Sequence, residues 1–190
     1  MITLITGGSG SGKSAYAEKY ICRVSNENGY KEKYYIATMQ VFDDEGQRKI
    51  DRHRRLRAGK GFITIEQPRD IKKAVEKLQS ENYLKTGRSA LLECMSNLVA
   101  NEMFQEEGAH ENTVEAVLKG VRHIREQAGN LVIVTNEIFS EAADYQGETE
   151  LYQEYLGQIN QKIAEIADQV VEVVYGIPVY HKNKLLSGEG

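Results

Sequence analysis

The sequence predicts an α/β protein with a mostly parallel sheet that carries helices on both faces. Short apolar runs rich in β-branched residues alternate with longer stretches of helical character, as strand–helix–strand units require. Several runs are continuously apolar, such as Leu131-Val132-Ile133-Val134, which is typical of strands covered on both faces. The 190 residues, 41% hydrophobic and 27% charged, suit a single domain over residues 1–190.

The expected elements follow from apolar patterning and from turn signals between the runs. Strands are expected at Ile2–Thr6, Tyr34–Thr38, Phe62–Ile65, Ser89–Glu93, Leu131–Thr135, Val170–Val174 and Ile177–His181. Helices are expected at Gly12–Val24, Asp43–Arg57, Arg69–Gln79, Met95–Glu106, Thr113–Glu126 and Glu150–Ala167. The Ser, Asn and Gly residues of Ser25–Gly29 predict the end of the first helix, and Phe139–Gly147, which has no clear period, predicts a surface loop.

A glycine-rich segment between the first strand and the first helix carries the strongest functional signal. It matches G-x-x-x-x-G-K-[ST] at every fixed position, and its residues are Gly7, Gly8, Ser9, Gly10, Ser11, Gly12, Lys13 and Ser14. Glycines allow the backbone N–H groups to wrap a phosphate, and the following helix presents its positive end to the anion. The motif in this context predicts a P-loop NTPase-type fold and a nucleoside triphosphate as ligand.

The same motif predicts a Mg²⁺ site, because the Ser14 hydroxyl can bind the metal that accompanies the nucleotide. A carboxylate at the end of a buried strand would complete such a site. Two residues fit this description: Glu93 ends the run Ser89–Glu93, and Glu137 follows Leu131–Asn136. The sequence favours Glu93 and leaves Glu137 as a competing candidate.

The segment Asp43–Arg57 opens with acidic residues and ends with basic ones, which favours a helix through its dipole. It places His53 among four arginines, Arg52, Arg54, Arg55 and Arg57. Neighbouring cations favour the neutral imidazole, which is a nucleophile, and the arginines are suited to hold phosphate beside it. Taken alone, however, the segment favours a solvated basic helix face that happens to carry a histidine.

Charge and hydropathy limit the function classes. The net charge of −4 argues against a protein that coats nucleic acid, because such binding relies on a basic face. No apolar run approaches the roughly 20 residues that span a bilayer. The N-terminus leads directly into the glycine-rich segment without a signal sequence. We therefore expect a cytoplasmic protein.

Several segments together resemble the bifunctional adenosylcobinamide kinase/adenosylcobinamide-phosphate guanylyltransferase family of cobalamin synthesis. They occur in the order of the family and extend over nearly the whole chain. They are residues 6–14, 35–40, 43–54, 64–68, 91–94, 134–137 and 157–161. The chain departs from the family pattern after Glu137 and after Arg57, where many members have a Val-Pro pair and an Arg-Pro pair.

The resemblance implies two reactions. ATP or GTP first phosphorylates the aminopropanol hydroxyl of adenosylcobinamide, and GMP is then transferred from GTP onto adenosylcobinamide phosphate through a guanylylated histidine. That role maps onto His53, so the resemblance replaces the interpretation of the segment as a solvated helix face. Lys13 would serve the phosphoryl transfer. The nucleotide contacts map onto Gly7–Ser14, Thr38, Met39, Gln40, Arg54, Arg55, Leu56, Arg57, Glu66 and Glu93. The resemblance also implies a homotrimer.

Two other functions fit the phosphate-binding motif. A P-loop kinase for a small metabolite would use the same loop with His53 in a structural role. A nucleotide-gated binding module would bind a partner only with nucleotide present, and Phe139–Gly147 could serve such a partner.

Overall fold

The computed structural model describes residues 1–40, 48, 51, 54–55, 57–78, 87–137 and 147–184. In this part of the chain seven strands form one sheet in the order β3-β2-β4-β5-β1-β6-β7. The strands are β1 (Ile2–Thr6), β2 (Glu32–Ala37), β3 (Phe62–Glu66), β4 (Arg88–Glu93), β5 (Asn130–Val134), β6 (Gln169–Val174) and β7 (Ile177–Asn183). All neighbouring pairs are parallel except β6 and β7, which confirms the mostly parallel sheet.

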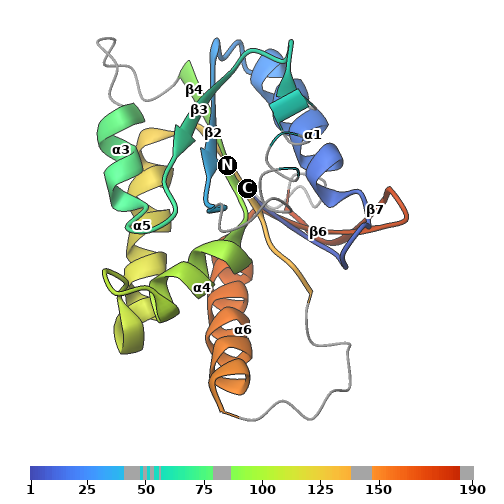
Figure 1. The fold of residues 1–190 in the computed structure, drawn as a ribbon. Helices are drawn as coiled ribbons and strands as arrows, with labels where there is room; N and C mark the ends of the chain where they lie inside the picture. Colours follow the sequence, from blue (N-terminus) through green and yellow to red (C-terminus); the bar gives the residue numbers. More distant parts are fainter. Residues whose placement is uncertain are drawn as a thin grey trace.

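Helices cover both faces of the sheet (Figure 1). They are α1 (Lys13–Glu27), α3 (Lys72–Leu78), α4 (Met95–Phe104), α5 (Thr113–Gln127) and α6 (Glu148–Ile166), with a short 3-10 helix at His110–Asn112. Helix α1 packs on one face, and α3, α4, α5 and α6 form a layer on the other. The expected α/β class with two helical layers is therefore confirmed.

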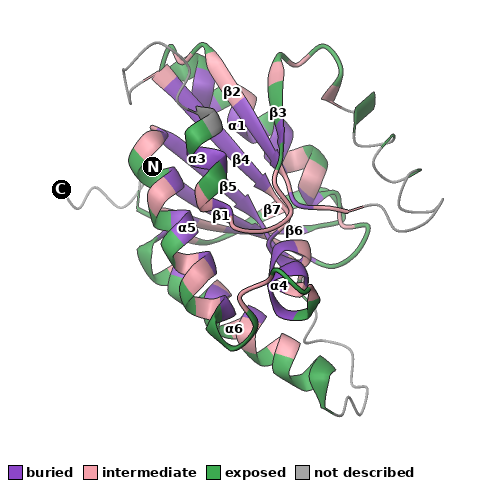
Figure 2. Cartoon of the chain, turned by 60° about the vertical axis from the view of Figure 1, so that its left-hand side comes forward, coloured by how far each residue is buried: buried purple, intermediate pink, exposed green. Residues whose placement is uncertain are grey.

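The continuous apolar runs are explained by burial on both faces of the sheet. Along β5, Leu131 and Ile133 belong to the core under α3–α6, whereas Val132 and Val134 belong to the core under α1. Because successive strand residues point to opposite faces, a strand between two helical layers needs an apolar residue at every position. In Figure 2 the central strands and the inward sides of the helices are accordingly buried, whereas the edge strands β3 and β7 are largely exposed.

Helix α1 extends beyond its expected end, so Ser25 does not stop it. The Ser25 hydroxyl is completely buried, where it donates to the Ile21 carbonyl oxygen at 2.6 Å and lies 2.7 Å from the Ser89 hydroxyl. These bonds satisfy the serine within the helix, since such hydroxyls can bond the carbonyl four residues earlier. The helix ends at Glu27, and Gly29, with a φ of 68°, makes the turn.

Two predicted segments lie largely outside the described residues. Of the helix expected over Asp43–Arg57, the structure describes Arg48, Asp51, Arg54, Arg55 and Arg57, all in helical conformation. Of the loop expected over Phe139–Gly147, it describes only Gly147, which precedes α6. Among the described helices, none combines the length and apolar character needed to cross a membrane.

The packing of α5 against Ile71, the residue before α3, gives a test of the fold. A Cβ added to Gly120 would lie 2.3 Å from Ile71 Cγ1, and both residues are buried. Gly120→Ala should therefore lower the free energy of unfolding by about 1–3 kcal/mol through overpacking, although alanine ordinarily favours a helix. Chemical denaturation measures the change, with exposed Lys119→Ala as the control. A Gly120→Ala protein at least as stable as the parent would contradict this packing.

Candidate active site

The segments that carry the functional motifs meet at the carboxyl edge of the sheet. The parallel register aligns Ala37 of β2 with Glu93 of β4 and with Glu66 of β3. Strand β1 ends at Thr6 and runs into the phosphate loop, Gly7–Ser14, at the same edge. Parallel strands all present their carboxyl ends on one side, where ligands bind in open α/β sheets. The strand order thus brings together residues that are far apart in the sequence.

The phosphate loop requires glycine at two positions for different reasons. Gly7, with a φ of 150°, lies so close to β6 that an added Cβ would be 2.6 Å from the Val173 carbonyl oxygen. Gly12, with a φ of 90°, is the left-handed N-cap of α1. In this conformation the Lys13 ammonium donates to the Gly8 carbonyl oxygen at 3.0 Å. The loop and the start of α1 therefore form an anion site closed by the lysine.

Ser14 and Glu93 are in direct contact, so the metal-ligand pair expected from the sequence comes together. The Ser14 hydroxyl donates to Glu93 Oε1 at 2.7 Å, while the buried Glu93 Oε2 has no partner among the described residues. A hydroxyl beside a carboxylate with a free oxygen fits the oxygen ligands that Mg²⁺ prefers. Glu137 is exposed, and its backbone N–H lies 3.4 Å from the Gly7 carbonyl oxygen.

Burial favours the neutral forms of the two ionisable side chains of the site, Glu93 and Lys13. It raises the pKa of Glu93 to about 7, although the Ser14 hydrogen bond and the Lys13 charge act in the opposite direction. Burial also lowers the pKa of Lys13, against the attraction of Glu93. Desolvation disfavours a charge that lacks full compensation. The ionised forms of Glu93 and Lys13 are thus not fully compensated by their neighbours, and a ligand that brings its own charges would stabilise them.

Thr38 connects the ends of β2 and β4. It is completely buried, and its hydroxyl donates to the Cys94 carbonyl oxygen at 2.8 Å and accepts from the Cys94 N–H at 2.8 Å. Its backbone N–H donates to the Glu93 carbonyl oxygen at 3.0 Å. The described side chain of Thr38 therefore positions the Glu93–Cys94 segment, while the adjacent Met39 and Gln40 are partly exposed.

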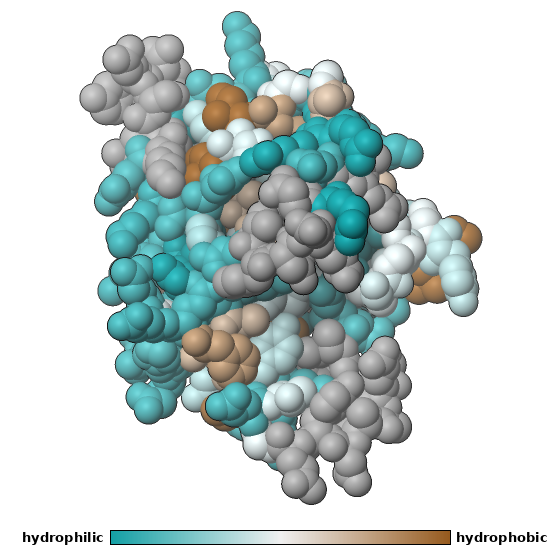
Figure 3. Space-filling model, viewed as in Figure 1, coloured by the Kyte–Doolittle hydropathy of each residue, from teal (hydrophilic) through white to brown (hydrophobic). Residues whose placement is uncertain are grey.

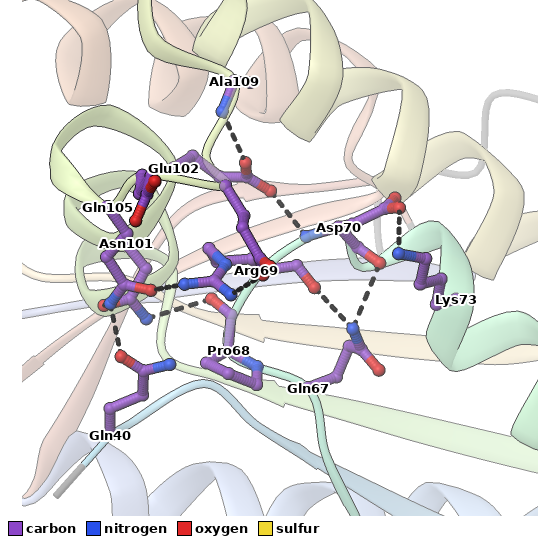
Figure 4. A network of polar contacts seen from close by, with 12 residues as sticks. Gln40, Gln67, Pro68, Arg69, Asp70, Lys73, Asn101, Glu102, Gln105 and Ala109 are labelled. Carbon is purple, nitrogen blue, oxygen red and sulfur yellow. Dashed lines mark hydrogen bonds and ion pairs between the residues drawn. The ribbon is translucent and has the colours of Figure 1, made fainter.

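A polar network from α4 supports these strand ends (Figure 4). The Asn101 amide donates to the Thr38 carbonyl oxygen at 2.8 Å and to the Pro68 carbonyl oxygen at 3.0 Å. The buried Glu102 carboxylate accepts from the backbone N–H groups of Asp70 at 2.6 Å and Ala109 at 3.1 Å. Buried, satisfied networks of this kind rigidify a structure. Sequence analysis missed both residues, because a polar pair inside an expected helix gives no sign of burial.

Two described arginines of the segment Asp43–Arg57, called the histidine segment from here on, contact β2 and β3. Arg54 pairs with Glu66 at 2.7 Å, and the Arg57 guanidinium lies over the Tyr35 ring at 3.8 Å from its centre. Arg55 is exposed, with its Nε 3.3 Å from the Asp51 carbonyl oxygen. His53 and Leu56, both named from the sequence, lie outside the described residues.

A pocket opens beside these arginines. Its volume is about 480 Å³, and its lining residues are Arg54, Arg57, Ala58, Gly59, Gly61, Phe62 and Thr64. This size suits a small-molecule ligand. Two guanidinium groups in its wall favour an anion, because arginine matches phosphate with a fork of donors.

An ion pair that the sequence did not reveal joins this region to the helix of the phosphate loop. The Lys60 ammonium contacts Glu18 Oε2 at 2.5 Å, and the Glu18 side chain is only 1% exposed. Glu18 lies one helical turn after Ser14 on α1. Nothing in its local sequence distinguishes it from a surface glutamate, since its burial depends on the segment packed over it.

The fold and this site define a P-loop nucleotide-binding α/β protein. A solved ATPase domain shares the fold at a TM-score of 0.54 and 12% identity, covering 90% of this chain and 68% of its own. A KaiC-like protein from Pyrococcus horikoshii OT3 does so at a TM-score of 0.52 and 12% identity, with 90% and 69% covered.

Sequence comparison identifies the family. The family described as cobinamide kinase / cobinamide phosphate guanyltransferase matches residues 3–180, and the chain belongs to it. The bifunctional adenosylcobalamin biosynthesis protein CobU of Escherichia coli (strain K12) is 29% identical over 190 residues, covering 94% of this chain and 98% of the relative. The corresponding CobP of Pseudomonas aeruginosa is 30% identical over 187 residues, covering 98% and 100%.

The raised pKa of Glu93 predicts how stability depends on pH without nucleotide or divalent metal. The native carboxyl keeps its proton up to about pH 7, whereas the unfolded one loses it near the ordinary value of 4.5. Between these values the native state binds more protons, so stability falls as pH rises. The loss attributable to Glu93 should be about 3 kcal/mol.

Denaturation of the parent and of Glu93→Gln in EDTA, at several pH values from 4.5 to 7.5, measures this contribution. Groups that do not interact with Glu93 affect both proteins equally, so the difference between the two curves reports the titration of Glu93 together with its coupling to Lys13. Parallel curves would show that Glu93 is not a buried carboxyl with a raised pKa.

Proposed function

We propose that this chain phosphorylates adenosylcobinamide and then converts adenosylcobinamide phosphate to adenosylcobinamide-GDP with GTP, in assembly of the cobalamin nucleotide loop. Family membership over residues 3–180 supports the substrates and the two reactions. The contact between Ser14 and Glu93 at the phosphate loop is the observation that carries the kinase activity. The guanidinium-lined pocket over β3 supports a second anion-binding site, and its arginines, Arg54 and Arg57, follow His53 closely in the sequence.

In the kinase reaction, the phosphate loop and the start of α1 bind the nucleotide phosphates through backbone N–H groups. Lys13 exchanges its bond with the Gly8 carbonyl oxygen for one with the terminal phosphates. Ser14 and Glu93 would hold Mg²⁺, which neutralises charge on the phosphate oxygens. The substrate hydroxyl gives up its proton to water as its oxygen forms a bond to the γ-phosphorus. The bond from that phosphorus to the β–γ bridging oxygen breaks, and the nucleoside diphosphate leaves.

In the guanylyl transfer, a ring nitrogen of His53 attacks the α-phosphorus of GTP and pyrophosphate leaves with the electron pair of the broken P–O bond. A phosphate oxygen of adenosylcobinamide phosphate then attacks the same phosphorus, and the N–P bond breaks. Nucleophilic catalysis divides one difficult displacement into two easier ones. Arg54, Arg55, Leu56, Arg57 and Glu66 would surround the nucleotide, with Thr38, Met39 and Gln40 at the adjoining strand end.

The resemblance to the family also supports an assembly and a location. We propose that three copies of the chain form a homotrimer and that it works in the cytoplasm. Light scattering of the purified protein tests the assembly, since a mass other than three chains would contradict it.

The covalent step predicts an acid-labile adduct on His53. Intact mass after incubation with Mg²⁺ and GTP should increase by one GMP, and mild acid should remove the increase. His53→Ala should form no adduct, while His123→Ala, which changes a histidine of α5 bonded to the Lys119 carbonyl oxygen, should form it as the parent does. Strong guanylyl transfer by His53→Ala would exclude the role of His53. No adduct on any protein, with phosphorylation intact, would favour a kinase alone.

Lys13→Ala should weaken both reactions and the phosphorylation more strongly. Removing one group that stabilises transition-state charge costs on the order of 100-fold or more in rate. Rates with ATP and adenosylcobinamide measure the effect, and exposed Lys19→Ala on the same helix serves as the control. Unchanged phosphorylation by Lys13→Ala would show that the loop does not bind the transferred phosphate.

A further inference from the structure

The turn between β6 and β7 contains a residue that its backbone conformation disfavours. Tyr175 and Gly176 form this two-residue turn with φ values of 50° and 79°. Hairpin turns with positive φ at both positions favour Asn-Gly or Gly-Gly, and a positive φ is uncommon for a bulky side chain. The Tyr175 side chain is 94% exposed, so burial in the described structure does not offset the cost. Such an outlier points to a functional reason for the tyrosine.

The same turn lies against the phosphate loop. The Gly176 N–H donates to the Ser11 carbonyl oxygen at 2.8 Å, and Gly176 Cα is 3.4 Å from the position of a Cβ on Gly12. The parallel pairing of Thr6 with Glu172 also places the end of β6 beside the beginning of the loop. Figure 1 shows the β6–β7 hairpin beside α1 at this edge of the sheet. The turn that carries Tyr175 therefore lies next to the phosphate loop.

The strand order indicates which part of a nucleotide faces this turn. Glu93 ends β4, which is separated from β1 by β5, whereas β6 and β7 lie on the other side of β1. With Lys13 and Ser14, Glu93 defines the end of the loop for the terminal phosphates. In a triphosphate bound in this direction, the nucleoside would lie on the side of the loop away from Glu93, toward the β6–β7 turn.

We propose that Tyr175 stacks on the base of the nucleoside triphosphate whose phosphates the loop Gly7–Ser14 binds. The inference rests on the proposed nucleotide site and adds a base subsite to it. An exposed aromatic ring stacks on any base, because every base has a π-face. A tyrosine here would hold a purine without distinguishing ATP from GTP. This binding role would explain why the chain has a tyrosine at a turn position that disfavours it.

A second copy of the chain is the alternative occupant of this surface. Ile177 and Val179 on β7 are 64% and 43% exposed, and the hairpin region contributes apolar surface at the right-hand edge of Figure 3. Ile177 immediately follows the turn, and no hydrogen bond joins it to the phosphate loop among the described residues, so Ile177→Asn is a matched control. It removes apolar surface from the same hairpin and leaves the tyrosine ring in place.

The test compares ligands with and without a base. Titration calorimetry with Mg²⁺ measures the affinities of ATP, GTP (as its α,β-methylene analogue, which cannot transfer GMP) and inorganic tripolyphosphate for the parent, Tyr175→Asn, Tyr175→Phe and Ile177→Asn. Tyr175→Asn should weaken ATP and GTP roughly 5- to 100-fold, the range expected for one stacked base, and leave tripolyphosphate unchanged. Tyr175→Phe and Ile177→Asn should bind all three ligands as the parent does. Asparagine suits the turn, so the melting temperature of Tyr175→Asn should not fall.

The outcomes separate this inference from the nucleotide site on which it rests. A parent that binds neither nucleotide nor tripolyphosphate would overturn the phosphate-loop function and the stacking with it. Parent-like nucleotide affinity in Tyr175→Asn, or an equal loss for tripolyphosphate, would overturn the stacking alone. A changed mass in light scattering for both Tyr175→Asn and Ile177→Asn, with nucleotide affinity unchanged, would assign the ring to a contact between copies.

Discussion

The contact between Ser14 and Glu93 is the constraint on which the rest of the site depends. It joins the first turn of α1 to the end of β4, a strand that is not adjacent to β1 in the sheet. The chain must therefore place both ends at one edge and hold them there. Thr38 fixes the Glu93–Cys94 segment through its hydroxyl and backbone, and Asn101 fixes Thr38 in turn. A loop motif and a carboxylate become one site only because this buried scaffold sets their separation.

The same contact carries an energetic cost that a ligand would offset. The Glu93 carboxyl is buried near Lys13, its Oε2 has no partner among the described residues, and its pKa is raised. The hydroxyl of Ser11 and Oε1 of Glu18 are also buried without partners among the described residues. Unsatisfied groups of this kind reduce the stability of the free protein, and a ligand that binds only the native state restores it. These groups lie on the phosphate loop, on α1 and at the end of β4, as a preorganised ligand site requires.

The sequence predicted the parts of this arrangement that depend on local patterns. The phosphate loop, all seven strands and the two-sided sheet follow from the motif and from continuous apolar runs such as that of β5. The choice between Glu93 and Glu137 could not be settled in the same way. Glu93 is the last residue of β4, whereas β5 ends at Val134, and only the folded arrangement of the strand ends shows which carboxylate reaches Ser14. The burial of Glu18 and Asn101 depends on Lys60 and on two distant backbone carbonyls. No local pattern records such long-range contacts.

In the proposed function, the two transfer reactions would share one sheet and use separate anion-binding places. Arg57, at the end of the segment Asp43–Arg57, lies on the Tyr35 ring of β2, and Lys60, three residues further on, pairs with Glu18 of α1. Strand β2 lies between β3 and β4, so it separates the guanidinium-lined pocket from Glu93. A buried carboxylate such as Glu18 is costly once its cation leaves, which favours keeping the segment against α1. The two attachments therefore hold Arg57 and Lys60 against β2 and against α1, the helix that begins in the phosphate loop.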